Sequence, residues 1–336
     1  MIKKILSQIL VGEIENYTGY LSSYGNISVD SYTEIYVDFL TWNVSPLVNF
    51  IGAIFQFCIF ALVLSLKLNK RVYNYIMLKS LMCTILLANL LFTGNAACLH
   101  CKSNYYNTKL RLIHKRIIIN VGSNSLINMV VATELLITFD RLCLLINNKN
   151  WLTKLKQKYI AIVIILFSII LYAPETLVYR YVQVTDQVFK SERIEFFYTI
   201  YYKIYYQSLN IFKIVFLIVY WILIILLVIN YRKFIEKKSR LMNKRFSKKA
   251  ENENNITKMI IIVGIGYFFA TVLLVTAQLI GLRQQLDSTY NAELIIIRTV
   301  SYILSSVCLS INALTVLYYD NNIKNKVRQI FGFSNA

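Results

Sequence analysis

Few ionisable residues of this chain lie inside or at the end of an apolar stretch, and three of them are close together on one segment. Glu134 stands inside the apolar stretch 117–139, and Asp140 and Arg141 follow directly after it. A lone ionised carboxylate in an apolar setting costs several kcal/mol, so we expect Glu134 to be either protonated or paired. No Ser-His or paired-carboxylate constellation lies within the apolar stretches. The sequence therefore predicts neither an enzyme nor a bound cofactor or metal.

Two apolar stretches each carry a polar face. Successive helical residues advance about 100°, which aligns the polar residues of 117–139, and likewise those of 294–319. The first face is Asn120, Ser123, Asn124, Asn128, Glu134 and Thr138, and the second is Arg298, Ser301, Ser305, Cys308 and Asn312. Such faces must point into a helix bundle.

Two interpretations of these faces stay open. They could be interhelical hydrogen bonds with cations that reach toward the membrane surface. They could instead line an outward-facing pocket with a cationic rim, which would favour an acidic or carboxylate-bearing ligand. The candidate pocket residues are Asn120, Ser123, Asn124, Lys213, Gln278, Arg298, Ser301 and Tyr302.

The elements that position these residues are apolar and long. The mean hydropathy is +0.53, 57% of residues are hydrophobic and 16% are charged. A helix needs roughly 20 apolar residues to cross a bilayer. Stretches of this kind occur at 46–66, 72–94, 117–139, 159–179, 209–230, 259–282 and 294–319. We expect an all-α, seven-transmembrane helix bundle over 46–319, because lipid offers the backbone no other partners.

The distribution of the net charge of +19 predicts the orientation of the bundle. Segments 66–79, 140–158, 231–258 and 320–336 contain 22 of the 36 Lys and Arg residues. The positive-inside rule places these segments in the cytosol and the N-terminus outside. The charge is thus explained by topology and by attraction to the lipid bilayer, and nucleic acid is not expected as a partner.

The two ends of the chain agree with this orientation. The extracellular segment 1–45 has glycosylation sequons at Asn16 and Asn26. Cys98 and Cys101, also outside, could form a local disulfide or remain free thiols. Inside, residues 320–336 place apolar side chains at helical spacing between basic ones, which predicts a short amphipathic eighth helix.

The run Thr138-Phe139-Asp140-Arg141-Leu142 is similar to the Asp-Arg-Tyr signature of rhodopsin-like G-protein-coupled receptors. The resemblance extends from Pro46 to Phe331 and is closest to divergent invertebrate orphan, chemosensory or peptide-receptor-like groups. It implies a plasma-membrane receptor that binds an extracellular peptide or small molecule and activates a heterotrimeric G protein. Arg141 would engage the G protein, and Asp140 would hold it in an ion pair at rest.

The resemblance also implies a conformational switch that includes Asn312, Asn89 and Glu134. Asn312 lies where the family has its Asn-Pro-x-x-Tyr motif, although Ala313 and Val316 replace the proline and the tyrosine. Asn89 could replace the buried aspartate of the second helix, with Thr84 as the alternative by register. The family's Trp-x-Pro in span six and the cysteine before span five are missing.

A seven-helix chemosensory ligand-gated channel and a small-solute transporter are the rival classes. A channel of the insect-chemoreceptor kind would have its N-terminus inside, opposite to the charge pattern. A transporter is expected to carry inverted repeats and paired helices broken by Gly or Pro, and the sequence has neither.

The predicted topology has a direct test. Glycosidase treatment should increase the electrophoretic mobility of the protein from eukaryotic cells, because Asn16 and Asn26 face the lumen during synthesis. The Asn16→Gln/Asn26→Gln variant should run at the deglycosylated position without treatment. Absence of any shift, with a tag on the N-terminus protected from protease outside the cell, would instead favour the channel.

Overall fold

The computed structural model describes residues 39–66, 71–91, 114–146, 156–174, 179–183, 189–193, 200–241, 248–287 and 292–330. The sequons at Asn16 and Asn26 and the cysteines Cys98 and Cys101 lie outside these ranges. Predictions that concern them remain predictions.

Helices make up almost all of the described chain. The helices are η1 (Leu40–Val44), α3 (Ser45–Leu66), α4 (Arg71–Leu91), η3 (His114–Ser123), α7 (Asn124–Leu145), α8 (Gln157–Tyr172), α10 (Ile200–Leu241), α11 (Lys248–Asp287), α12 (Ala292–Tyr319) and α13 (Asn321–Ile330), where η marks a π-helix. A hairpin of β1 (Tyr179–Gln183) and β2 (Phe189–Arg193), with Tyr181 opposite Ser191, adds two short antiparallel strands to the expected all-α fold.

In the part of the chain that the structure describes, five helical segments are long and apolar enough to cross a membrane. They are Ser45–Leu66, Arg71–Leu91, Ile204–Glu236, Asn254–Leu273 and Thr299–Tyr319. Helices α10 and α11 continue beyond their apolar parts into the basic segment 231–258. These helices indicate a multi-pass membrane protein.

The third and fourth expected spans are less apolar or shorter. Helix α7 carries Glu134, Asp140 and Arg141 within 22 residues. Helix α8 has 16 residues and ends at Tyr172, shortly before Pro174. Ala173 still donates its backbone N–H to Ile169 O in the α conformation, but Pro174 has no backbone N–H to continue the helix, which explains the end of α8.

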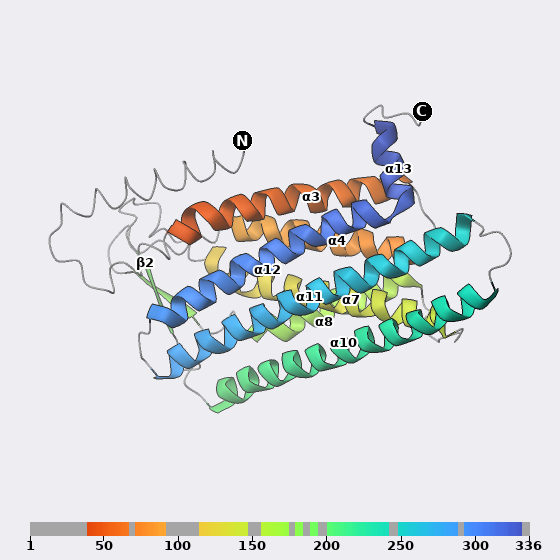
Figure 1. Ribbon diagram of the computed structural model, residues 1–336. Helices are drawn as coiled ribbons and strands as arrows, with labels where there is room; N and C mark the ends of the chain where they lie inside the picture. The colour runs from red at the N-terminus through yellow and green to blue at the C-terminus, as the bar shows by residue number, and fades with distance from the viewer. Residues whose placement is uncertain are drawn as a thin grey trace.

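The long helices lie side by side as a bundle (Figure 1). Among the described helices, α3, α4, α7, α10, α11 and α12 contact one another in that order, and α12 returns to contact α3. Helix α7 touches α4, α8, α10 and α11, so it lies at the centre of the packing. Helix α13 turns away from the bundle axis where α12 ends (Figure 1).

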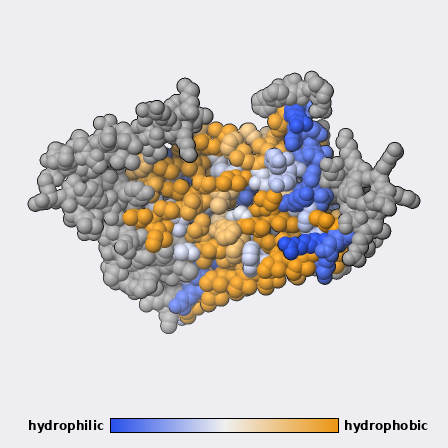
Figure 2. Space-filling model, viewed as in Figure 1, coloured by the Kyte–Doolittle hydropathy of each residue, from blue (hydrophilic) through white to orange (hydrophobic). Residues whose placement is uncertain are grey.

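The outer surface of the bundle is apolar. Phe57, Ile170 and Ile211 are among many large hydrophobic side chains that are more than half exposed. Apolar residues cover the broad middle of the molecule, and hydrophilic residues gather at the end beside α13 (Figure 2). An exposed apolar surface of this extent fits contact with lipid rather than with water.

Close contact between α3 and α12 depends on Gly52. A Cβ atom at this position would collide with Ser310 Oγ, and it would also lie 3.0 Å from Leu87 Cδ1 on α4. Small residues at helix contacts let backbones approach within a membrane. Gly52 therefore allows α3 to pack against two neighbours at once.

We predict that Gly52→Ala lowers stability by about 1–3 kcal/mol, the usual cost of overpacking. Ser310→Ala removes the nearest colliding atom, so the double variant should recover part of this loss. Gly122→Ala is the matched control, since a Cβ there would meet only Ile117 O at 3.5 Å. Thermal unfolding in detergent gives the melting temperatures of wild type, Gly52→Ala, Gly52→Ala/Ser310→Ala and Gly122→Ala. Equal melting temperatures for Gly52→Ala and wild type would contradict the close approach.

Candidate functional site

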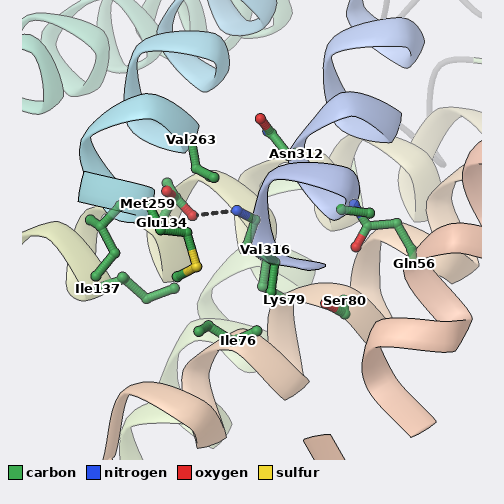
Figure 3. Close-up of a pocket in the computed structure, with 12 residues that line it drawn as sticks. Gln56, Ile76, Lys79, Ser80, Glu134, Ile137, Met259, Val263, Asn312 and Val316 are labelled. Atoms are coloured by element: carbon green, nitrogen blue, oxygen red, sulfur yellow. Dashed lines mark hydrogen bonds and ion pairs between the residues drawn. The ribbon is translucent and has the colours of Figure 1, made fainter. Parts of the chain in front are cut away.

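A buried ion pair joins two helices in the middle of the bundle. Lys79 Nζ of α4 lies 2.6 Å from Glu134 Oε2 of α7 (Figure 3). The side chains are only 8% and 1% exposed. Of the two states expected for Glu134, the structure therefore has the paired one. Lys79, which the sequence interpretation counted among the cytoplasmic charges, is a buried partner instead.

A third helix contributes to the same contact. Lys79 Nζ lies 4.7 Å from the centre of the Tyr267 ring on α11, within the range of a cation–π interaction. The Tyr267 hydroxyl lies 3.9 Å from Cys83 Sγ on α4. The ammonium group therefore links α4 to both α7 and α11.

The ion pair borders a small hollow with room for about one water molecule. Its lining is mostly apolar with a few polar groups: Gln56, Ile76, Lys79, Ser80, Glu134, Ile137, Met259, Ile260, Val263, Asn312, Ala313 and Val316 (Figure 3). Gln56 of α3 donates from Nε2 to the backbone oxygen of Leu309 at 2.8 Å. The amide nitrogen of Asn312 is buried and has no hydrogen-bond partner among the described residues.

A second polar group lies where α7 ends beside α13. Arg71 Nε of α4 is 3.8 Å from Asp140 Oδ1, and the Arg71 guanidinium also donates to the Tyr75 hydroxyl. Arg141 is 4% exposed, so its guanidinium is enclosed by the bundle in this conformation. Asp140 thus has an ion pair with Arg71, a residue that the sequence interpretation assigned to topology alone.

The environment of Asp140 favours its neutral form. Burial raises the pKa of the Asp140 carboxyl above its usual value, and the charges of Arg71 and then Arg141 lower it in part. The carboxyl is therefore easier to protonate than an exposed aspartate.

Helix α13 is tied to this end of the bundle through its first turn. Asp320 Oδ1 accepts hydrogen bonds from the backbone N–H groups of Asn322 at 2.9 Å and Ile323 at 3.3 Å, as an N-cap does. Asn322 Nδ2 donates to the Tyr73 hydroxyl of α4 at 2.8 Å. Ile323 is completely buried. We call Arg71, Tyr73, Asp140, Arg141 and Asp320 the α13-end cluster.

Another small hollow lies between α7, α8, α10 and α11. Of the candidate pocket residues, Asn124 and Lys213 line it, together with Asn128, Tyr172, Thr271 and apolar side chains. Lys213 Nζ lies 5.4 Å from the centre of the Tyr172 ring. Asn128 donates to Ser168 Oγ of α8 at 2.9 Å, so this polar position serves helix packing.

The remaining candidates are divided. Ser123 and Ser301 are buried and donate to backbone oxygens of their own helices, and Tyr302 is half-buried. The side chains of three further candidates lie outside the described residues: Asn120, Gln278 and Arg298.

The switch residues implied by the resemblance are partly brought together. Glu134 and Asn312 line the same hollow, but the α4 groups that join them are Lys79 and Ser80. Asn89 is half-buried ten residues further along α4, about 15 Å away at 1.5 Å per helical residue.

One signal in the sequence could have identified Lys79. It lies inside the apolar stretch 72–94, where a cation needs a partner, and Glu134 is the carboxylate inside another span. Nothing comparable marks Arg71 or Tyr73, because both lie at the edge of a span. Within the described ranges, no group of three or more His, Cys, Asp or Glu side chains could hold a metal ion.

No protein-family model matches the chain, and no curated protein matches it either.

The protonation of Asp140 gives a prediction with a defined sign. Because its pKa is raised in the folded protein, its contribution to stability is present at acid pH and is lost as the pH rises from about 4 toward neutrality. Asp140→Asn cannot titrate, so it should lose less stability than wild type over this range. Arg71→Met removes the positive charge that lowers the pKa of Asp140 most, so the loss of stability should extend to higher pH.

Melting temperatures of the three proteins in detergent, measured across this pH range, are the readout. A wild-type profile parallel to that of Asp140→Asn would show that Asp140 is not the titrating group.

Proposed function

We propose that the chain is a seven-helix cell-surface receptor that activates a heterotrimeric G protein. In this proposal α7 and α8 complete the seven spans, the N-terminus is outside and α13 lies on the cytoplasmic face of the plasma membrane. The ligand is an extracellular peptide or small molecule. The receptor acts by changing shape, so it needs no catalytic residue of its own.

The observation that carries the proposal is the place of Asp140 and Arg141. Both lie at the end of the central helix α7, at the same end of the bundle as α13 and the long extensions of α10 and α11. Arg141 is buried, while Asp140 contacts Arg71 of α4. An inward-held arginine that a change of helix packing could expose is what a receptor of this class requires for contact with a G protein.

The hollow beside Lys213, away from the α13-end cluster, supports a ligand site within the bundle. It lies between four helices and combines apolar walls with amide, hydroxyl and ammonium groups. Ligand sites in helix bundles have this composition. The ammonium group of Lys213 favours a ligand with a carboxylate or another acidic group.

Transport of a small solute is the second candidate, and one observation favours it. Charged pairs inside a membrane often belong to ion or proton pathways, and Lys79 and Glu134 form such a pair beside a hollow. Proteoliposomes that contain the purified protein would distinguish the two, because a transporter moves solute without any G protein.

Ligand-independent nucleotide exchange tests the receptor function. Membranes with the wild-type chain should speed exchange on purified G proteins of at least one Gα class above the rate with empty membranes. Asp140→Asn weakens the contact with Arg71, worth about 1 kcal/mol for a partly exposed pair. A change of this size shifts a two-state population about fivefold, so the basal rate should rise by up to that factor. Arg141→Ala should reduce it to background.

Leu144→Ala, at an exposed position one turn further along α7, is the matched control and should behave as wild type. Surface labelling of an N-terminal tag establishes that each variant reaches the membrane. The proposal would be overturned if wild type and Asp140→Asn, both present at the surface, left exchange at background with every Gα class.

A further inference from the structure

The buried ion pair lies in a polar layer that divides the apolar core. Two clusters of buried hydrophobic residues follow each other along the bundle. On α4, Lys79 separates Ile76 of one cluster from Met82 of the other. On α7, Glu134 separates Ile137 from Val131, and on α12 Asn312 stands between Ala313 and Leu309.

The net contribution of such a layer to stability is small by comparison with an apolar one. Replacing a buried ion pair by apolar groups of similar volume is often neutral or stabilising, whereas removing one partner is strongly destabilising. The pair is therefore a weak source of net stability. The attraction between the two charges of the pair does depend strongly on their distance. In a low dielectric, this attraction opposes any separation of the charges that does not admit water between them.

This attraction acts between residues of different helices, so it opposes movement of these helices relative to one another. Lys79 is on α4, Glu134 is on α7 and the Tyr267 ring that faces the ammonium is on α11. Movement of α11 away from α7 would withdraw the ring from Lys79 and open the layer. While the pair is closed, these three helices stay together.

The hollow beside the ion pair contains hydrogen-bonding groups that the Glu134 carboxylate would need if the pair separated. The amide nitrogen of Asn312 is a donor without a partner in the described part of the chain, and Asn312 is 4% exposed. Its amide oxygen would lie 3.1 Å from a Cβ at Gly266, so α11 passes directly over it. Asn312, Ser80 and Glu134 line the same hollow, so a carboxylate that turns into it after α11 moves would meet this donor directly or through a water molecule.

We propose that Lys79 and Glu134 form an intramembrane lock that holds α4, α7 and α11 in the closed arrangement, with the hollow at Asn312 receiving the carboxylate when the lock opens. The lock goes beyond G-protein coupling and does not depend on it. It is a conformational device of the bundle, whichever protein or solute the bundle serves.

Stability and conformation are measured separately to test the lock. Lys79→Met and Glu134→Gln each leave one buried group without its partner and should melt about 5–10 °C below wild type. The Lys79→Met/Glu134→Gln variant should recover most of this loss. The charge-reversed variant Lys79→Glu/Glu134→Lys restores an opposite pair.

Conformation is measured by double electron–electron resonance between spin labels at positions 144 on α7 and 258 on α11, both exposed. The protein is reconstituted in nanodiscs after replacement of the native cysteines that react with the label. Wild type should give one distance. The neutral double variant should give a second, longer distance despite its recovered stability, and the charge-reversed variant should return to the single distance.

A pair that only supports the fold would give a different pattern. If the neutral double variant kept the single wild-type distance, the proposed lock would not exist. Failure of the neutral double variant to fold would also overturn the proposal, because the pair would then be required for the fold itself. Neither result concerns G-protein activation, so the proposed function would be unaffected.

Discussion

A charge buried within a helix bundle in lipid needs a partner, and this constraint positions the centre of the molecule. Lys79 and Glu134 satisfy it at 2.6 Å. The contact sets the rotation of α4 and α7, since each helix must turn its charged residue toward the other. The hydrophobic residues of the same helices then face the core or the outer surface, as the exposed apolar side chains of the bundle do.

Helix α7 connects this centre to the α13-end cluster. Glu134 and Asp140 are six residues apart, about 9 Å along a helix. Both carboxylates contact cations of α4, at Lys79 and Arg71 respectively. A rotation or shift of α7 against α4 therefore acts on both ion pairs together. In the proposed function, this is the physical link through which a change in the middle of the bundle would reach Arg141 and α13.

Hydrophobic runs were enough to predict the helices, because length and apolarity decide whether a segment can lie in lipid. The helical spacing of polar and apolar residues also predicted the amphipathic helix after Asp320 and the inward face of α7 with Glu134. The partners of the charged residues were less predictable. Lys79 pairs across 55 positions of sequence, and Arg71 meets Asp140 only because α4 and α7 pack side by side. Such contacts depend on helix rotation and register, which periodicity alone leaves open.

The ionised state of Glu134 can be observed directly by infrared spectroscopy of the protein in nanodiscs. In wild type, a pair with Lys79 predicts no absorption from a protonated carboxyl group that Glu134→Gln removes. In Lys79→Met, such a band should appear, and it should vanish again in Lys79→Met/Glu134→Gln. A protonated Glu134 band that is already present in wild type and unchanged by Lys79→Met would contradict the buried ion pair.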